Sequence, residues 1–424
     1  MQTYLKNGYI VSMDQQDTVF DGGGVLVEDD RITAVGKVDP RLVKPDAEVI
    51  DLQGKYVLPG FVNTHVHTSQ QISRGVGDDV DFICWLHDRM WPFESSMTEE
   101  DSYVSTLMTS LELIRSGVTS FAEPGGQFVS GMARGTAESG LRGKLAKSVM
   151  DCGEGLPEIW QRTMEQELEQ QVADLEKFHN TADGRVQVWF GLRTIFNNTD
   201  ELCVRTKELA DKYGIGIHMH VAEAKEEKEY TYARWGEGTV KHLERLGVLD
   251  KNLLAVHTVW LTDEELELFG RYDVIANTTC VWHYGNPDME AVIGDRQNRT
   301  FRIRTMINGG CRMGQGSDFP VDEFGREPLK GIEMGCTRQL FDHPELPVLK
   351  PYEEKLSVDD GIRSYTINNA YQMHMDDRLG SIEAGKYADL VILEKNLFDV
   401  PLDEIHNVKV CETIMDGKTT YCNY

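Results

Sequence analysis

The sequence predicts an α/β protein, a (β/α)8 TIM barrel with a small composite β-sandwich domain formed by both ends of the chain. Two observations predict it. Eight short apolar runs alternate with stretches of helical pattern over roughly 300 residues, the length and order of this barrel. Segments rich in strand and turn residues stand at the two ends. The alternative, a doubly wound open sheet, lacks the glycine-rich phosphate loops that would support it.

The two ends of the chain share a β pattern. Near the start, "VLVEDDRITAVG" is typical of strands separated by an Asp-Asp turn, and near the end "GSIEAGKYADLVIL" has the same character. An Asp416-Gly417 pair predicts a tight hairpin between the last two strands. We therefore expect residues 1–57 and 376–424 to build one β-sandwich domain, and residues 58–375 to form the barrel.

The barrel prediction depends on the order of its elements. Thr98 with Asp101, and Thr262 with Glu265, have the spacing of helix N-caps that bond back to the third helical residue. These pairs mark the starts of two of the helices between the runs. The eight runs expected to be strands span residues 60–67, 117–123, 143–151, 185–193, 214–223, 253–260, 274–280 and 313–319.

The net charge indicates which partners to expect, and the cysteine distribution indicates which cellular compartment to expect. The formal net charge is −27, which disfavours binding to nucleic acid or to an anionic membrane surface. The eight cysteines contain no C-x-x-C pair, a distribution typical of reduced thiols in a cytosolic enzyme. The start of the chain does not have the pattern of a secretory signal, and no run approaches the ~18 apolar residues of a membrane span. We expect a cytoplasmic protein with neither a nucleic-acid nor a membrane partner.

Histidines and an aspartate stand at the ends of several predicted strands. "GFVNTHVH" places His65 and His67 two residues apart, so that both side chains point the same way. His220 ends the fifth run and Asp318 the eighth. The carboxyl ends of barrel strands converge on one face, where the chemistry of such barrels lies. Three imidazoles and one carboxylate suit a divalent transition metal, with zinc expected and iron as the alternative.

Two further side chains at the same face suit proton transfer. Glu223 lies three residues beyond His220 and could carry protons to a leaving group, although a solvated glutamate in the acidic run that follows is the alternative. His257 ends the sixth run and could polarise the attacking water. Asp318 could accept the proton of that water while it also contacts the metal. A single histidine in a strand is more often a packing residue, so the prediction depends on the convergence of the whole set.

In their order, "LPGFVNTHVH", "HMHVAE", "AVHTVWLTDEE" and "GSD" resemble the amidohydrolase superfamily. The resemblance extends over nearly the whole chain and is nearest to the mononuclear branch, which includes cytosine, guanine and S-adenosylhomocysteine deaminases and the triazine hydrolases. It implies that His65, His67, His220 and Asp318 bind the metal, that Glu223 carries the proton and that His257 assists the hydroxide. The two-metal branch would have a lysine or glutamate at the end of strand 4. Here Arg193 stands near that end, so one ion per subunit is expected.

The same resemblance implies which segments meet the substrate. "SRGVGDDVDFICWLHDRMWPFE" is similar to the substrate loop of these deaminases, and its tryptophans could stack on a flat ring, although packing against the barrel is the alternative. The strand-7 and strand-8 loops, "NTTCVWHYGNPD" and "GSDFP", depart from the usual pattern of relatives. The substrate contacts expected on these grounds are Gln70, Trp85, Trp91, Arg193 and His283.

The resulting functional prediction is a metal-dependent aminohydrolase. An activated hydroxide attacks an sp2 carbon of a nitrogen heterocycle, and ammonia or an amine leaves. The same site could instead displace chloride or thiolate, or hydrolyse an acyclic amide, urea or carbamate. A catalytically inactive scaffold is the remote alternative, and an oxidoreductase lacks a dinucleotide-binding sequence. Relatives of this kind are commonly homodimers or larger homo-oligomers, which we expect here too.

Overall fold

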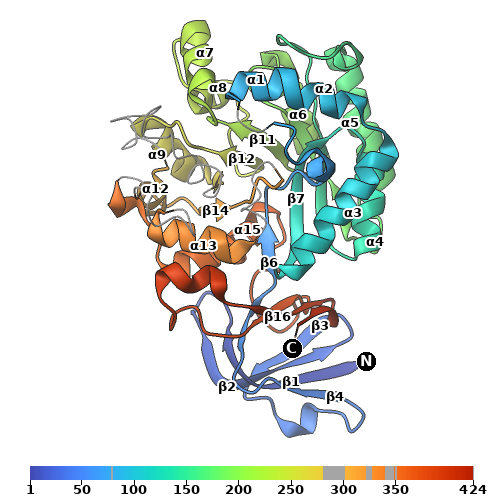
Figure 1. Cartoon of the computed structure of the whole chain (residues 1–424), viewed down its shortest axis with the longest axis vertical. Coiled ribbons are helices and arrows are strands. Elements are labelled where there is room, and N and C mark those ends of the chain that lie inside the picture. Colours follow the sequence, from blue (N-terminus) through green and yellow to red (C-terminus); the bar gives the residue numbers. More distant parts are fainter. Residues whose placement is uncertain (78–79, 280–300, 321–326, 340–347, 349–350, 424) are drawn as a thin grey trace.

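The computed structural model describes residues 1–77, 80–279, 301–320, 327–339, 348 and 351–423. The predicted fold class is confirmed. Parallel strands surrounded by helices form a barrel, and a separate sheet built from both termini lies at one end of it (Figure 1). The bounds 57/58 and 375/376 of the two domains stay a prediction.

The barrel strands lie in the order in which they occur along the chain. Two parallel sheets, β6-β7-β8-β9 and β10-β11-β12-β13-β14, make up its wall. They are closed by a parallel bridge between Val66 and Phe319 and by the Asp318 N–H, which donates to the His65 carbonyl at 2.9 Å. The strands are β6 (Phe61–Asn63), β7 (Val118–Gly126), β8 (Arg142–Lys147), β9 (Val186–Val188), β10 (Phe190–Leu192), β11 (Ile217–Val221), β12 (Leu253–His257), β13 (Ile275–Thr278) and β14 (Gly314–Gln315).

The fourth predicted run holds two short strands instead of one. β9 pairs with β8, while β10 pairs with β11, and only Trp189 lies between them. Trp189 N–H still donates to the Leu145 carbonyl, so the chain changes partner without leaving the wall. The hydrophobic pattern of residues 185–193 is continuous and could not reveal this change of partner.

Helices follow the strands on the outside of the barrel (Figure 1). Both predicted capping boxes are confirmed, at Thr98 with Asp101 and at Thr262 with Glu265. Within the described residues, no helix combines the length and apolar character needed to cross a membrane. The helices are α1 (Phe82–Cys84), α2 (Trp91–Ser96), α3 (Glu99–Arg115), α4 (Val129–Ser139), α5 (Met164–Phe178), α6 (Asp200–Tyr213), α7 (Lys225–Trp235), α8 (Thr239–Arg245), α9 (Asp263–Tyr272), α12 (Ile303–Asn308), α13 (Pro328–Thr337), α14 (Val358–Ser364) and α15 (Ile367–Gln372).

The terminal sheet joins the two ends of the chain through one strand. β5 pairs with β1 on one side and with β15 on the other, in the order β17-β16-β15-β5-β1-β2-β3, and β4 pairs with β1. The predicted Asp416-Gly417 hairpin connects the last two strands, with both residues left-handed. The strands are β1 (Gln2–Val11), β2 (Val19–Glu28), β3 (Arg31–Gly36), β4 (Glu48–Asp51), β5 (Tyr56–Pro59), β15 (Leu390–Leu393), β16 (Val410–Met415) and β17 (Lys418–Cys422).

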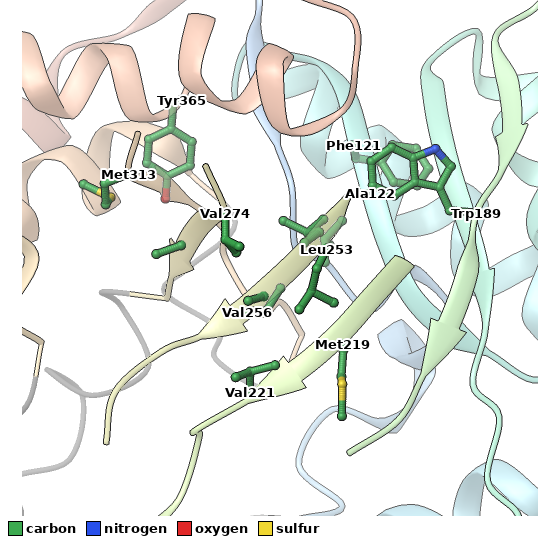
Figure 2. Packing of buried hydrophobic residues seen from close by; sticks show 14 of the residues in the cluster. Phe121, Ala122, Trp189, Met219, Val221, Leu253, Val256, Val274, Met313 and Tyr365 are labelled. Carbon is green, nitrogen blue, oxygen red and sulfur yellow. The ribbon is translucent and has the colours of Figure 1, made fainter. Parts of the chain in front are cut away.

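Alternation along β11 explains how a buried strand can carry both core and site residues. Met219 and Val221 are fully buried in the large apolar cluster, and Figure 2 shows them beside Leu253 and Val256 of the neighbouring strand β12. Successive side chains of a strand point to opposite faces. His220 lies between Met219 and Val221 and therefore faces the interior of the barrel.

Candidate metal centre and its surroundings

Four side chains from three parts of the barrel meet at its mouth. His65 Nε2 lies 3.0 Å from Asp318 Oδ1, and His67 Nε2 lies 3.4 Å from the same oxygen. His220 Nε2 lies 3.4 Å from His67 Nε2. All four residues are buried. The structure thus brings together the strand-1, strand-5 and strand-8 residues, which lie up to 253 positions apart in the sequence.

The donor set fits a divalent cation. His220 Nδ1 lies 3.0 Å from the Arg193 carbonyl, which can only accept, so this nitrogen carries the proton and Nε2 keeps its lone pair. That lone pair faces the other imidazoles. Within the described residues, His65, His67 and His220 form one group able to hold a metal, and His65, His257 and Asp318 form another, with ligand atoms within 4.8 Å of one another. Imidazole and carboxylate donors at this spacing suit zinc or a similar ion.

Burial keeps the imidazoles of His67 and His220 neutral. It lowers the pKa of His67 to about 4, against the opposing effect of Asp318, and lowers the pKa of His220 well below its ordinary value. Removing a cation from water is costly, and a buried histidine therefore loses its proton. Neutral imidazoles are the form that binds metals, so the site is set up for a cation at neutral pH.

Glu223 and His257 form a second pair beside the four residues. Glu223 Oε1 lies 3.6 Å from His257 Nε2, and His257 Nδ1 lies 3.1 Å from Thr279 Oγ1. Burial, with a contribution from the nearby Asp318 carboxylate, raises the pKa of Glu223 well above its ordinary value. Burial also lowers the pKa of His257 to about 3. Burial therefore favours the protonated carboxyl of Glu223 and the neutral imidazole of His257, a combination suited to delivering a proton.

The backbone at this mouth is strained. Ala222, His257, Thr258 and Asp318 all have left-handed conformations, with φ of 53°, 74°, 52° and 55°. Residues with a side chain seldom adopt this region, which costs of order 1–3 kcal/mol at each position. Ala222 comes directly after β11, His257 ends β12 with Thr258 behind it, and Asp318 follows β14. Such strain persists where surrounding contacts hold it and is frequent at functional sites.

Two predicted substrate contacts lie in buried positions with unused polar atoms. Arg193 is 4% exposed, and its Nε and Nη1 have no acceptor within the described part of the chain. Gln70 donates from Nε2 to Glu94 Oε1 at 2.7 Å, while its Oε1 has no partner there. Burial raises the pKa of Glu94, and the nearby Arg193 cation opposes that shift. Buried polar atoms without partners are rare in folded proteins, so these point to a ligand.

The predicted aromatic contacts lie in the segment after strand 1. Trp91 is buried with Leu86, Met150 and Trp160, and its ring stacks on His87 at 4.7 Å between centroids. Trp85 is partly buried against the same cluster. These contacts fit the packing alternative for Trp91, and a role in substrate stacking stays a prediction for both residues. The predicted contact His283 lies outside the described residues.

Sequence reasoning missed two buried carboxyls near the site. Glu123, at the end of the second predicted run, accepts from Thr68 Oγ1 at 2.6 Å and from Gly125 N at 3.1 Å. Its Oε1 lies 4.0 Å from His67 Nδ1, and burial raises its pKa to about 7. Its place at a strand end could have indicated it. Glu94 belongs to α2 and ends the segment predicted as the substrate loop, but the prediction did not single it out.

The histidine at position 218 lies behind the metal group. His218 Nε2 is 3.1 Å from His65 Nδ1, and both rings are buried. It is absent from the groups able to hold a metal among the described residues. Its contact fixes how the His65 ring is turned, which is what partners of metal-binding histidines do.

Comparison with known proteins adds to this geometry. The model of the amidohydrolase family matches residues 56–420. The 5'-deoxyadenosine deaminase of Methanobrevibacter smithii is 29% identical over 408 residues, covering 93% of this chain and 87% of that protein. The 5-methylthioadenosine/S-adenosylhomocysteine deaminase of Thermoanaerobacter pseudethanolicus is 30% identical over 401 residues, covering 93% of this chain and 85% of its own length.

A solved structure is also similar. The adenosine deaminase from Xanthomonas campestris with bound zinc superimposes with a TM-score of 0.82 at 20% identity, covering 98% of this chain and 92% of the other. At that identity the likeness shows the fold alone.

Proposed function

This chain belongs to the amidohydrolase family, whose model matches residues 56–420, and we propose that it is a metal-dependent aminohydrolase acting on a nitrogen heterocycle. The single observation that carries the proposal is the convergence of His65, His67, His220 and Asp318 beside the Glu223–His257 pair. The deaminase relatives support the reaction type.

The proposed cation is held by His65, His67, His220 and Asp318. When bound, a divalent ion there supplies Lewis-acid activation of water, whose pKa falls toward ~7. We propose one ion per subunit, with zinc first, because the donor set is mostly imidazole. The proposal includes a cytoplasmic location and a homo-oligomeric state, which rest on the sequence.

The protein side chains move the protons. In the overall reaction an oxygen–carbon bond forms, a carbon–nitrogen bond breaks, and the departing nitrogen gains a proton. Glu223, whose protonated form burial favours, would donate to the ring nitrogen or to the leaving amine. Asp318 would take the proton that the attacking water loses. His257 is neutral and would stabilise the negative charge that develops at the attacked carbon's oxygen.

Arg193 and Gln70 would orient the substrate. The Nε and Nη1 donors of the Arg193 guanidinium, which have no acceptor among the described residues, suit an electron-rich acceptor such as an exocyclic carbonyl or a ring nitrogen. The Oε1 of Gln70, which has no donor in the part of the chain that the structure describes, suits a ring N–H or an amino group. A heterocycle that presents both kinds of atom on one edge satisfies the two side chains together.

The test is ammonia release from a panel of aminopurines, pteridines, pyrimidines and triazines, with the metal content measured on the same sample. We expect turnover of at least one ring, and Arg193→Met should raise KM for it by about tenfold or more, the cost of a lost charge-assisted hydrogen bond. If only acyclic amides or only chlorinated rings are turned over, the proposed release of an amine from a heterocycle is wrong. A preparation that holds well under one ion per chain and acts on none of these compounds would support an inactive scaffold.

A further inference from the structure

A buried glutamate that has no role in the proposed reaction lies behind the proton carrier. Glu227 is in the first turn of α7 and is 1% exposed, whereas its neighbour Glu226 on the same helix is exposed. Glutamates are almost never fully buried unless they are paired or hydrogen-bonded. The position of Glu227 therefore requires partners inside the protein.

Those partners are the backbone of the turn that carries Glu223. Glu227 Oε1 accepts from the Ala222 N–H at 2.8 Å, and Oε2 accepts from the Glu223 N–H at 2.9 Å. Oε1 also accepts from Thr239 Oγ1, in the first turn of α8, at 2.6 Å. One carboxylate thus ties together the end of β11, the start of α7 and the start of α8.

The turn needs such support because its conformation is unfavourable on its own. Ala222 is left-handed, with φ of 53°, and it comes directly after strand β11 and directly before Glu223. The Ala222 carbonyl is fixed as well, since it accepts from the Val259 and Trp260 N–H groups at 3.1 and 3.0 Å. The strained residue is therefore held on both sides, and Glu227 provides the hold on its N–H side.

We propose that Glu227 is a positioning residue for Glu223, whose carboxyl it keeps facing His257 by fixing the backbone of residues 222–223. The inference rests on the proposed function, because it concerns the same proton carrier. Glu227 itself lies outside the reacting group. Its two oxygens act through the peptide N–H groups, which is how an outer partner orients a functional side chain without touching the substrate.

Glu227→Gln tests the proposal with little change in volume. In glutamine an NH₂ donor replaces one of the two carboxylate oxygens, so the arrangement in which Oε1 accepts from the Ala222 N–H and Oε2 from the Glu223 N–H is lost. We expect kcat to fall by about 10- to 100-fold, the usual cost of losing an outer partner, with KM within about twofold and metal content unchanged. Glu226→Gln is the matched control and should leave kcat unchanged. A Glu227→Gln enzyme with wild-type kcat would overturn the proposal.

A double-mutant cycle separates positioning from general stability. If Glu227 acts through Glu223, adding Glu227→Gln to a Glu223→Gln enzyme should lower kcat by less than about twofold, because the residue being positioned is already gone. An undiminished loss in that background would show that Glu227 acts by another route and would contradict the proposal. If Glu227→Gln does not fold, Thr239→Val removes only the hydroxyl bond to the same carboxylate and should lower kcat by a smaller factor, whereas an unchanged kcat would count against the proposal.

Amide hydrogen exchange gives a readout that needs no substrate. The N–H groups of residues 222 and 223 should exchange faster in Glu227→Gln than in the wild type, and at the wild-type rate in Glu226→Gln. If the wild type turns over no heterocycle, the proposed function fails, but the exchange comparison still tests the positioning. Unchanged exchange at both amides in Glu227→Gln would overturn it.

Discussion

Charged groups are buried at two places, the junction between the barrel and the terminal sheet and the mouth of the barrel. The two places differ in whether the buried arginine is paired. At the junction Arg142 is 3% exposed, and its Nε donates to Asp389 Oδ2 at 3.0 Å while Nη2 also meets Asp416. Its guanidinium lies 3.8 Å from the centre of the Tyr387 ring. At the mouth, Arg193 is equally buried, yet two of its nitrogens have no partner within the described residues.

The difference separates structural charge from functional charge. A buried cation that is paired with carboxylates from another part of the chain holds two parts of the fold together. At the mouth, a buried cation whose donors lack partners among the described residues lies near strained backbone and neutral imidazoles. Such an arrangement lowers the stability of the folded state, so folding alone does not explain it. We infer that the unused atoms at the mouth are there for a substrate and a metal. The predictions below test each side of this comparison.

The largest effect is expected from removing a metal ligand. His67→Ala takes away one imidazole of the group and should lower kcat/KM by at least about a thousandfold, or ~4 kcal/mol, together with bound metal. Ammonia release and metal analysis of the same preparation check it. Because the terminal sheet has its own core, its strands should remain folded. A wild-type kcat/KM in His67→Ala would contradict the proposed metal site at the mouth of the barrel.

Glu223→Gln should come next. The amide keeps the size of the carboxyl but cannot deliver a proton, so kcat should fall by about 10²- to 10⁴-fold. Bound metal should stay at the wild-type level, since Glu223 is not one of the proposed ligands. Steady-state kinetics with metal analysis distinguish this variant from His67→Ala, and loss of the ion in Glu223→Gln would contradict the separate roles.

At the junction the expected loss is of stability instead of activity. Arg142→Met removes the guanidinium that is paired with Asp389 and Asp416 and should lower the free energy of unfolding by about 3–5 kcal/mol. Denaturant unfolding checks it, and activity per folded molecule should not change. Arg185→Met is the control, because that side chain is partly exposed and 3.9 Å from Asp416, and should cost at most about 1 kcal/mol.

Lys144 is an intermediate case, a buried cation beside a neutral partner. Its Nζ contacts Gln187 Oε1 and lies 4.9 Å from the centre of the Trp189 ring. Burial lowers its pKa to about 7, so from pH 7 up to its unfolded value the unfolded chain binds more protons. Stability should therefore rise with pH in that window, by up to about 1.4 kcal/mol per unit, and should be flat below it.

Unfolding measured at several pH values in the wild type and in Lys144→Met isolates this contribution. The free energy of unfolding of the wild type minus that of Lys144→Met should rise above pH 7. The exposed Lys212→Met serves as control and should follow the wild type at every pH. Parallel curves for Lys144→Met would mean that the buried lysine keeps its proton.

Local patterns explain why much of the fold was predictable. The caps at Thr98 and Thr262 depend on residues three positions apart, and the eight runs depend on apolar alternation with helices. His65, His67, His220 and Asp318 could be placed together because a barrel brings strand ends to one face. Their role as ligands stays a prediction that the geometry supports.

Contacts between distant segments could not be predicted in the same way. Arg142 and Asp389 are 247 positions apart, and no local pattern in the sequence pairs the two. The change of partner at Trp189 depends on hydrogen bonding that the apolar pattern does not encode. Glu227 sits in an acidic run whose members look alike in sequence, and only burial sets it apart from Glu226.

X-ray absorption at the metal edge of the purified protein tests the central claim most directly. The account predicts one ion per chain bound by about three imidazole nitrogens and a carboxylate oxygen at ~2.0–2.2 Å, a signal that His67→Ala abolishes. Sulfur ligands, or an ion that is retained unchanged in His67→Ala, would contradict it.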